Sequence, residues 1–440
     1  WWNFPEIERE FLDGIKPDYI YLTHLHWDHF HSPSLRLFDR ETQFLVPKIP
    51  GTRMVRDLRS IKRNNITEIS HGKSFELWEG CRLHSYQFGV FAADSAAIIS
   101  DGETTLLNAN DCKIFGLPLD HIRRKFPKID FVFRSHSSAT PVPYCIKGYK
   151  QDFAGHRTAD DYIEEFASFS HSVGARYAIP FASNHCFLHR ETRSFNDTGV
   201  NPQMVADHYN SNSDAAATEC VIMPPGSSWS REEGFKLREF DYARKDEMIE
   251  AMSVKYADKL EKQYAKEEGF KSSFAAFERY FSGFLLSVPF VIRWALPKVL
   301  FKTHDPDGAK FYLLDIPSKK VRELTADTDE VDLKITTPAI VLMSCVRQKM
   351  FSTWSASKRL EIELVKSGLQ KLNIFLAALD LYENEGLPFR SNLSPRNFGI
   401  WLRRWREGLE GLRLVVKHKI LRRRFVISEL YSKKGSVAND

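Results

Sequence analysis

The sequence predicts an α/β protein whose first half is a layered sandwich of sheets and helices. Strand-like and helix-like segments alternate through residues 1–230, which is the pattern of sheets covered by helices. Apolar residues make up 43% of the chain and charged residues 27%, the balance of a folded globular protein. A chain of 440 residues is too long for one ordinary domain, so we expect two or three.

The elements of the first half follow from local residue patterns. The β-rich run 18–23 predicts a short strand, and apolar residues at helical spacing over 52–63 predict a helix. Asp101-Gly102 separates two apolar runs and predicts a tight hairpin. Further strands are expected at 81–86, 130–133 and 176–181, and a further helix at 159–173.

The composition changes in the second half. Charge rises and glycine is rare over 231–280, which predicts a charged helical linker. Residues 281–395 are expected to form a smaller α+β domain, followed by a basic amphipathic tail over 396–440. The strands of this domain are predicted at 310–315, 331–336 and 360–364.

Several classes of protein are excluded or disfavoured by composition. The net charge of +5 says little about partners, and the six cysteines are scattered without a CxxC motif, which favours reduced thiols and a cytoplasmic protein. The apolar stretch 281–301 contains Pro289, Arg293 and Pro297, so a buried or interfacial helix pair is expected there instead of a bilayer span. No signal peptide is visible after Trp1, and we expect a fragment or a processed form.

The strongest chemical signal is His24-Leu-His26-Trp-Asp28-His29, directly after the strand at 18–23. His24 and His26 are two residues apart at a strand end, so both imidazoles can project to the same side. Three imidazoles and one carboxylate within six residues suit zinc, iron or another transition metal. Two ligand groups in so short a segment can serve two adjacent metals.

This motif resembles the metallo-β-lactamase superfamily, whose fold is an αββα sandwich with a dinuclear metal site. The resemblance implies that His24 and His26 bind a first metal and that Asp28 and His29 bind a second. Asp111, which ends the strand-like run 106–111, would bridge the metals. His185, at the end of 178–185, would be the last histidine ligand. Both residues follow apolar strands, where neighbouring strands can bring them together. Two zinc ions are expected, with iron or manganese as alternatives.

One further histidine ligand is less clearly marked. In this family it lies between the first motif and the bridging Asp, and the candidates are His71 and His84. His84 is favoured because it lies in the predicted strand 81–86. The family's His-Gly pattern at the strand end is absent, since Gln87-Phe88-Gly89 stands there, so the site can also lack or replace this ligand.

A finer resemblance is to the branch that contains ascorbate-6-phosphate lactonase and the CMP-N-acetylneuraminate hydroxylases. Trp1-Trp2-Asn3, Asn108–Asp111 and Ile179–Phe181 are similar to the hydroxylase-like members. Those hydroxylases also carry a Rieske iron–sulfur domain, for which this sequence has no Cys-His pairs. The opening strands of the family, with their Asp-Pro segment, are also expected to be missing.

Substrate-binding residues are expected in the loop after the strand at 130–133. Ser135, His136 and Tyr144 are the candidates, and His136 fits an ordinary loop histidine equally well. His156, His171 and His189 are predicted to be surface or capping residues.

The C-terminal segments allow several interpretations. Residues 332–338 and 357–363 are similar in order to the sterol-carrier-protein fold, which implies an apolar ligand tunnel or a dimerisation or docking role. In the tail, Trp401, Trp405 and Leu409 share a helical face among many arginines. The tail can therefore bind an anionic membrane surface, or it can pack on its own domain. Nucleic acid is a third option, but no recognised nucleic-acid-binding module accompanies the basic residues.

The leading functional hypothesis is a metal-dependent hydrolase. A metal-bound hydroxide would attack an ester, lactone or phosphodiester of a small-molecule substrate, with Asp28 or Asp111 orienting the water and moving its proton. The alternatives are a diiron oxygenase fed by a separate redox protein, and a non-catalytic binding protein with a degenerate metal site. Homo-oligomerisation through the C-terminal domain and peripheral membrane contact are further expectations.

Overall fold

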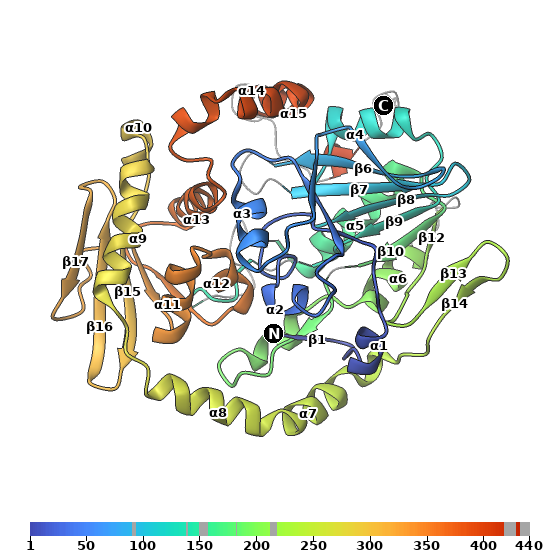
Figure 1. The fold of residues 1–440 in the computed structure, drawn as a ribbon. Coiled ribbons are helices and arrows are strands. Elements are labelled where there is room, and N and C mark those ends of the chain that lie inside the picture. The colour runs from blue at the N-terminus through green and yellow to red at the C-terminus, as the bar shows by residue number, and fades with distance from the viewer. Residues whose placement is uncertain are drawn as a thin grey trace, which may run out of the picture.

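The computed structural model describes residues 1–89, 94–137, 140–148, 157–181, 183–211, 218–417 and 428–431. Two β-structured regions lie side by side, with the two helices α7 (Lys245–Lys255) and α8 (Ala257–Glu268) running along one edge of both (Figure 1). The prediction of a mixed α/β protein is confirmed.

The first region is built on a seven-stranded sheet. Its spatial order is β12-β10-β9-β8-β7-β6-β5, with β5 to β8 antiparallel and β8, β9, β10 and β12 parallel. The strands are β5 (Ser74–Trp78), β6 (Cys81–Phe88), β7 (Asp94–Ser100), β8 (Thr105–Asn110), β9 (Phe131–Arg134), β10 (Tyr177–Pro180) and β12 (Glu219–Cys220). The predicted hairpin joins β7 and β8, and Gly102 has the positive φ of 91° that such a tight turn favours.

A second, parallel sheet of three strands packs face to face on the first. It contains β2 (Tyr19–Tyr21), β3 (Gln43–Pro47) and β4 (Ile66–Ile69). Leu45 and Ile69 of this sheet share an apolar cluster with Leu83 and Ala97 of the large sheet. The Tyr21 hydroxyl lies 2.8 Å from the Oγ atoms of both Ser85 and Ser95, so polar contacts also join the two sheets.

Helices cover the outer face of each sheet. On the small sheet, α3 (Arg53–Ser60) buries Met54 and Leu58 against Phe44 and Val46. On the large sheet lie α4 (Gly116–Lys125), α5 (Ala159–Val173) and α6 (Pro202–Ser211). The Thr158–Asp161 capping box and Gly174 fix the ends of α5 at the predicted residues. The four layers are the predicted αββα sandwich.

The second region is a five-stranded sheet with helices packed on it. Its order is β17-β16-β15-β18-β19, with β15 and β18 parallel and the other neighbours antiparallel. The elements are α9 (Phe274–Ser287), α10 (Phe290–Arg293), β15 (Lys298–Asp305), β16 (Gly308–Asp315), β17 (Lys320–Leu324), β18 (Leu333–Thr336), α11 (Ala339–Gln348), α12 (Ser352–Ser357), β19 (Glu361–Leu364) and α13 (Leu369–Glu383). A large apolar cluster rich in phenylalanine forms its core.

The stretch 281–301 differs partly from the prediction of a helix pair. Its first part forms the end of α9 and the short α10, but residues from Lys298 onward form β15, which is the central strand of the second sheet. Val299 and Phe301 alternate with Leu300 as the strand passes through the sheet, and all three are buried. Among the described residues, none of the helices combines the length and apolarity needed to cross a bilayer.

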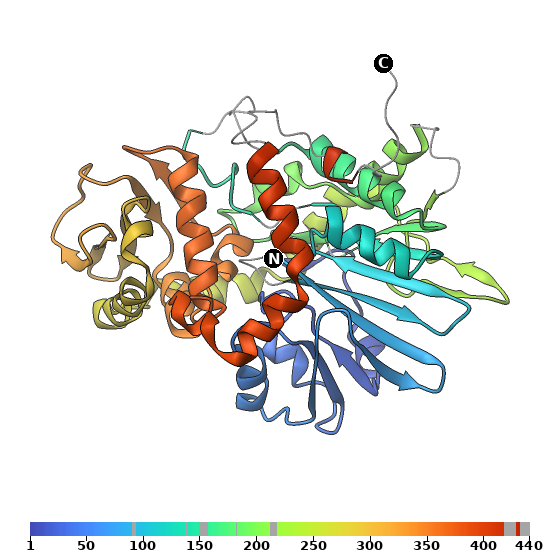
Figure 2. The ribbon, with the colours of Figure 1, turned by 90° about the horizontal axis from the view of Figure 1, so that it is seen from above.

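Near the C-terminus, α14 (Pro395–Arg403) and α15 (Trp405–Val415) cross over the first region, and α15 lies against α4 (Figures 1 and 2). Glu407 accepts a hydrogen bond from the Gly89 N–H (2.9 Å), and Glu410 accepts one from the Leu117 N–H (3.1 Å). The basic residues Lys419 and Arg422 to Arg424 of the predicted tail, and also His156, lie outside the described residues.

Smaller elements complete the described chain. They are β1 (Trp2–Asn3), α1 (Arg9–Asp13), α2 (Ser32–Leu35), β11 (His185–Cys186), η1 (Arg193–Thr198), β13 (Ser228–Ser230), β14 (Gly234–Lys236), η2 (Tyr242–Arg244), η3 (Phe389–Leu393) and α16 (Ser428–Tyr431). Strand β1 pairs with β11, so the first residues lie beside the predicted ligand His185.

Glu383, at the end of α13, is a buried carboxyl group between the two regions. It accepts hydrogen bonds from the Phe351 N–H (2.6 Å) and the Tyr280 hydroxyl (2.9 Å). Burial raises its pKa from 4.5 to about 8. Between pH 4.5 and pH 8 the folded protein keeps a proton on Glu383 that the unfolded chain has lost. The stability that this proton contributes is complete below pH 4.5 and is lost as the pH rises through 8.

We therefore predict that Glu383→Gln flattens the pH dependence of stability. From about pH 5 to 8 the free energy of unfolding of the parent should fall by about 2–4 kcal/mol relative to the variant, because each pKa unit is worth about 1.4 kcal/mol. Urea denaturation across this range measures the difference. Parallel pH profiles for the two proteins would show that Glu383 is already ionised at the lower pH.

Candidate metal centre

The histidine motif lies where β2 leaves the small sheet. Residues 22–31 turn between β2 and α2, so the motif is folded over the ends of both sheets. The Thr23 hydroxyl lies 3.1 Å from His24 Nδ1 and 3.0 Å from His29 Nδ1. The Ser95 hydroxyl donates to the Thr23 carbonyl (2.6 Å), which anchors the start of the motif to β7.

The imidazoles of the motif converge with a carboxylate from β8. His24 Nε2 lies 3.0 Å from His26 Nδ1, and the ring centroids of His24 and His29 are 4.0 Å apart. His29 Nε2 lies 3.1 Å from Asp111 Oδ2 and 3.7 Å from Asp28 Oδ2. The structure therefore brings together five of the predicted site residues: His24, His26, Asp28, His29 and Asp111.

The local backbone explains how Asp111 reaches this cluster. Asn110 ends β8 with a positive φ of 40°, a conformation that Asn tolerates better than most residues. Its side-chain amide donates to the Ser95 carbonyl (2.9 Å), and its Oδ1 accepts from the Asp111 N–H (2.6 Å). Asn110 thus turns the chain out of the sheet and fixes Asp111 at its edge.

Two carboxylates that the sequence interpretation missed also belong to the cluster. Asp94 opens β7 and places Oδ1 3.7 Å from His24 Nδ1. Asp380, from α13 of the second region, places Oδ1 3.5 Å from His26 Nε2. Each has a weak signal in the sequence that could have marked it as a ligand. Asp94 directly precedes the apolar run Ser95–Ile99, and Asp380 interrupts the mostly apolar helix 369–383.

His84 is not brought to the cluster, which corrects the ligand set implied by the resemblance. It pairs with Ile98, four residues along β7 from Asp94, so it lies about 13 Å from the ligand end of the sheet. Strand alternation also turns His84 toward the helical layer, where its ring packs edge-on against Phe126, with 5.0 Å between the ring centroids. His71 accepts a hydrogen bond from the Gln87 N–H and likewise lies outside the cluster.

A large cleft with a volume of about 1610 Å³ opens over the cluster. Both regions line it, since Asp28 and Asp111 come from the sandwich and Leu376, Leu379 and Asp380 from α13. His185 also lines the cleft, but its ring packs at a tilt against Trp1 (4.3 Å between centroids), and it does not join the cluster of His24, His26, His29 and Asp111.

The predicted substrate residues are separated by the structure. Ser135 lines the cleft, whereas Tyr144 lines a neighbouring cavity. His136 is buried and is absent from the described linings of both; its backbone N–H donates to the Ser183 hydroxyl (3.0 Å). Burial lowers the pKa of His136 to about 3, so the ring is neutral near pH 7.

The electrostatics of the cluster combine burial with close charges. Burial and the other imidazoles hold the pKa of His24 well below its ordinary value, so this ring is neutral. Burial opposes charge on His26 as well, but Asp380, Asp94 and Asp28 raise its pKa to about 10. Burial raises the pKa of Asp94 to about 7.

These side chains form two sets of metal-ligating atoms. His24, His29 and Asp111 form one set, and His24, His26 and Asp94 form the other, with the atoms of each within 4.8 Å of one another. Two imidazoles and one carboxylate suit catalytic zinc and also non-haem iron. The cluster can therefore hold a transition metal, with Asp28 and Asp380 beside it.

Comparison with known proteins gives partial matches, and no family model matches the chain. A Mycobacterium tuberculosis protein with the provisional name Rieske 2Fe-2S iron-sulfur protein is 28% identical over 222 residues, covering 46% of this chain and 41% of the relative. Cytidine monophosphate-N-acetylneuraminic acid hydroxylase from Asterias rubens is 30% identical over 118 residues, covering 26% of this chain and 18% of the relative. The chain thus spans less than half the length of these curated relatives.

Among solved structures, isothiocyanate hydrolase from Delia radicum gut bacteria is similar over 50% of this chain and 78% of its own, with 13% identity and a TM-score of 0.34. CmlA, a diiron β-hydroxylase from Streptomyces venezuelae, is similar over 46% of this chain and 43% of its own, with 13% identity and a TM-score of 0.31.

We predict that metal content depends on His24 and not on His84. Protein purified without added metal should hold about one to two equivalents of transition metal per chain, as expected for such ligand sets. His24→Ala should remove most of it because His24 belongs to both sets. His84→Ala is the matched control and should keep it. Elemental analysis by mass spectrometry measures both, and equal losses in the two variants would contradict this ligand assignment.

Proposed function

We propose that the chain is a metal-dependent enzyme and that the cleft over the histidine cluster is its active site. The observation that carries the proposal is the pair of two-histidine, one-carboxylate sets that share the buried His24, because their other members His26, His29, Asp94 and Asp111 line the cleft. A single buried histidine is usually structural, but ligand atoms that converge from the segment after β2, from β7 and from the residue after β8 favour a common partner.

The side chains fit a transition metal on their own geometry. Asp94 Oδ1 is buried and has no hydrogen-bond partner among the described residues, which is costly for a carboxylate unless a cation satisfies it. Neutral His24 has one unprotonated ring nitrogen, whose lone pair can bind a metal. A metal would satisfy both groups.

Hydrolysis is the reaction that the residues favour, with an ester, lactone or phosphodiester as substrate. A bound metal would supply a Lewis acid and would acidify water at neutral pH. Asp28 faces the cleft beside His29 and is placed to hold a proton taken from water. Asp111 is hydrogen-bonded to His29, and although burial opposes ionisation, His29 lowers the pKa of Asp111 to about 2. Asp111 thus stays ionised.

Both regions contribute to substrate binding in this proposal. The apolar residues Phe351, Leu376 and Leu379 of the second region form part of the lining of the cleft. This part of the lining suits a small molecule with an apolar part. A sterol-carrier-like role, homo-oligomerisation through the second region and a cytoplasmic location stay predictions.

Oxygenation is the second candidate, and a specific observation favours it. The curated relatives carry names that refer to a Rieske iron–sulfur protein and to a hydroxylase. A two-histidine, one-carboxylate set also suits non-haem iron that activates oxygen. In this case the chain would hold iron and would receive electrons from a separate redox protein.

Metal identity separates these candidates from each other and from a binding protein. For a hydrolase, we expect zinc or manganese after purification without added metal, and hydrolysis of p-nitrophenyl ester or bis-p-nitrophenyl phosphate. Asp28→Asn should lower this rate by about 10²- to 10⁴-fold, the usual contribution of acid–base catalysis, without changing metal content. Iron together with oxygen consumption on addition of a reductant would favour the oxygenase. Protein without bound metal would contradict both.

A further inference from the structure

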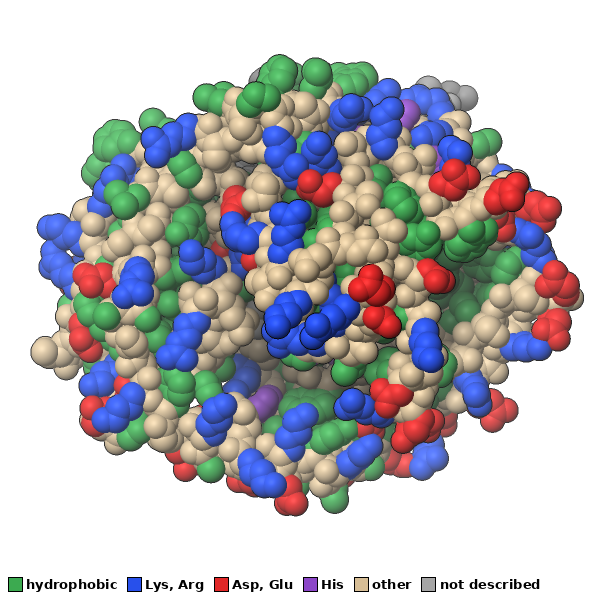
Figure 3. Space-filling view, viewed as in Figure 1, with side chains coloured by type: hydrophobic (Ala, Val, Ile, Leu, Met, Phe, Trp, Pro, Cys, Tyr) green, Lys and Arg blue, Asp and Glu red, His purple; other side chains and the backbone are tan. Residues whose placement is uncertain are grey.

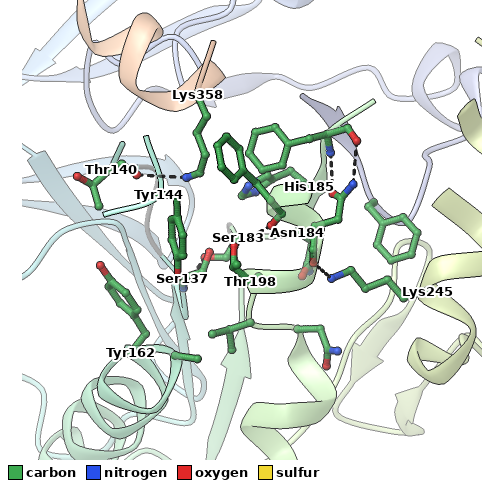
Figure 4. Close-up of a pocket in the computed structure, with 18 of the residues that line it drawn as sticks. Ser137, Thr140, Tyr144, Tyr162, Ser183, Asn184, His185, Thr198, Lys245 and Lys358 are labelled. Atoms are coloured by element: carbon green, nitrogen blue, oxygen red, sulfur yellow. Dashed lines mark hydrogen bonds between the residues drawn. The ribbon is translucent and has the colours of Figure 1, made fainter. Parts of the chain in front are cut away.

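A smaller cavity adjoins the metal cleft. Its volume is about 60 Å³, and Ser137, Thr140, Ser183, Asn184 and His185 line both spaces (Figure 4). A water molecule needs about 10–15 Å³ of such volume, so the cavity has room for a polar group of several atoms. A molecule in the cleft can therefore place one end in this cavity.

Lys358 is the feature that sets this cavity apart. Its side chain is only 5% exposed, and its Nζ donates to the Thr140 carbonyl (3.2 Å) beside the rings of Tyr144 and Phe187. Among the described residues, Lys358 has no carboxylate partner. A buried ammonium group without a counter-ion is costly, and burial accordingly lowers its pKa from 10.5 to about 8.

The backbone holds Lys358 in an unusual conformation. It has a φ of 54°, in the left-handed region that residues with a side chain rarely adopt. It follows α12, so the second region delivers this ammonium group to a cavity that is otherwise lined by residues from the first 245 of the chain. Such strain at a buried charge is typical of functional positions.

The remaining lining is also positive or neutral. Lys245 approaches from another side of the cavity, and its Nζ donates to the Asn196 carbonyl (2.5 Å) (Figure 4). Arg157 is already paired with Glu165 (2.5 Å). Neither Asp nor Glu is among the described residues that line the cavity. The cavity therefore favours an anion.

We propose that this cavity binds an anionic group of the substrate, a carboxylate or a phosphate, with Lys358 as its counter-ion. The shared lining then places the rest of the substrate in the cleft, over the histidine cluster. The inference that the cavity binds an anion depends only on its lining and on Lys358. Its role in positioning substrate rests on the proposed metal-dependent activity.

The test uses inorganic phosphate and acetate as probes of the 440-residue chain. Thermal denaturation with increasing concentrations of each anion should raise the Tm of the parent by a few degrees in a saturable manner, because ligands that bind only the folded state stabilise it. The anion that saturates at the lower concentration identifies the group. In Lys358→Met the rise should disappear, and without anion this variant should melt no lower than the parent, since it lacks an unpaired buried charge.

Two controls separate the cavity from the metal site. Lys349→Met removes an exposed lysine that also has a left-handed φ (52°), and it should keep the full response. His24→Ala should keep the response as well, because the cavity does not need the metal. A response that survives in Lys358→Met but is lost in His24→Ala would place the anion on the metal and overturn the subsite. Absence of any response in the parent would also overturn it.

A separate observation concerns the outward face of α14 and α15. Phe398, Leu402, Trp405, Leu409 and Leu412 follow one another at intervals of three and four residues, and all are exposed. The buried side of α15 carries the charged residues Glu407 and Glu410 instead, and Arg404 directly before the helix is buried as well. This helix therefore turns its polar side inward and its apolar side to solvent, the reverse of an ordinary surface helix.

The surroundings of this face favour an anionic lipid surface. Figure 3 shows apolar side chains gathered at the edge that α14 and α15 occupy, with basic side chains around them. Arg403 and Arg406 have no acidic partner among the described residues, and Arg406 stacks on Trp405 (4.6 Å). Helix α10 lies at the same edge of the molecule (Figure 1), and Phe290 at its start and Trp294 directly after it are both exposed. Basic residues beside exposed aromatic residues suit the interface of a charged bilayer.

We propose that the exposed face of α14 and α15 binds an anionic membrane surface. Co-sedimentation with phosphatidylcholine vesicles that contain phosphatidylserine should recover the protein in the pellet, and added salt should reduce binding because it screens charge. Leu409→Gln and Leu412→Gln together should abolish binding. Trp78→Gln, which changes an exposed ring on β5, is the matched control. No binding by the parent, or a dimer in solution that the double variant dissociates, would overturn the proposal.

Discussion

The arrangement of the whole molecule depends on one constraint, which is the burial of several imidazoles and carboxylates at a common point. His24 is fully buried, its neighbours His26 and His29 are in direct contact with it, and Asp94 and Asp111 close the cluster. Such groups cannot be removed from water without compensation. The surrounding fold supplies part of it through serine, threonine and asparagine contacts, while the ligand atoms that face one another are suited to a cation.

Contacts away from the cluster also hold the two β-structured regions together. Arg53 of α3 donates to the carbonyls of Glu383 (2.8 Å) and Gln348 (2.9 Å), and Arg359 makes paired hydrogen bonds with Glu267 of α8 (2.7 Å each). Ile146 forms a parallel bridge with Ile362 of β19. Buried arginines with several partners fix a single arrangement well, because breaking one contact leaves a charge unsatisfied. The second region is thereby held where it can complete the cleft.

Much of the sandwich could be predicted from the sequence, because its signals are local. The capped helix α5, the β7–β8 hairpin and the histidine motif after β2 each depend on residues that are neighbours in the chain. His84 was misplaced because sequence cannot give strand register or the side of a strand that faces the site. Asp94 and Asp380 were missed for the same reason, since each joins the cluster through tertiary packing. The boundaries expected at residues 230, 280 and 395 stay predictions.

The contact between His26 and Asp380 joins the chemistry of the first region to the position of the second. Helix α13 is held by the phenylalanine-rich core, so a small rotation of that core would move Asp380 relative to the His26 imidazole. The ring would then exchange a charged neighbour for solvent. Its nitrogen resonances would consequently follow the docking of the two regions, which makes His26 an intrinsic probe of interdomain motion that needs no attached label.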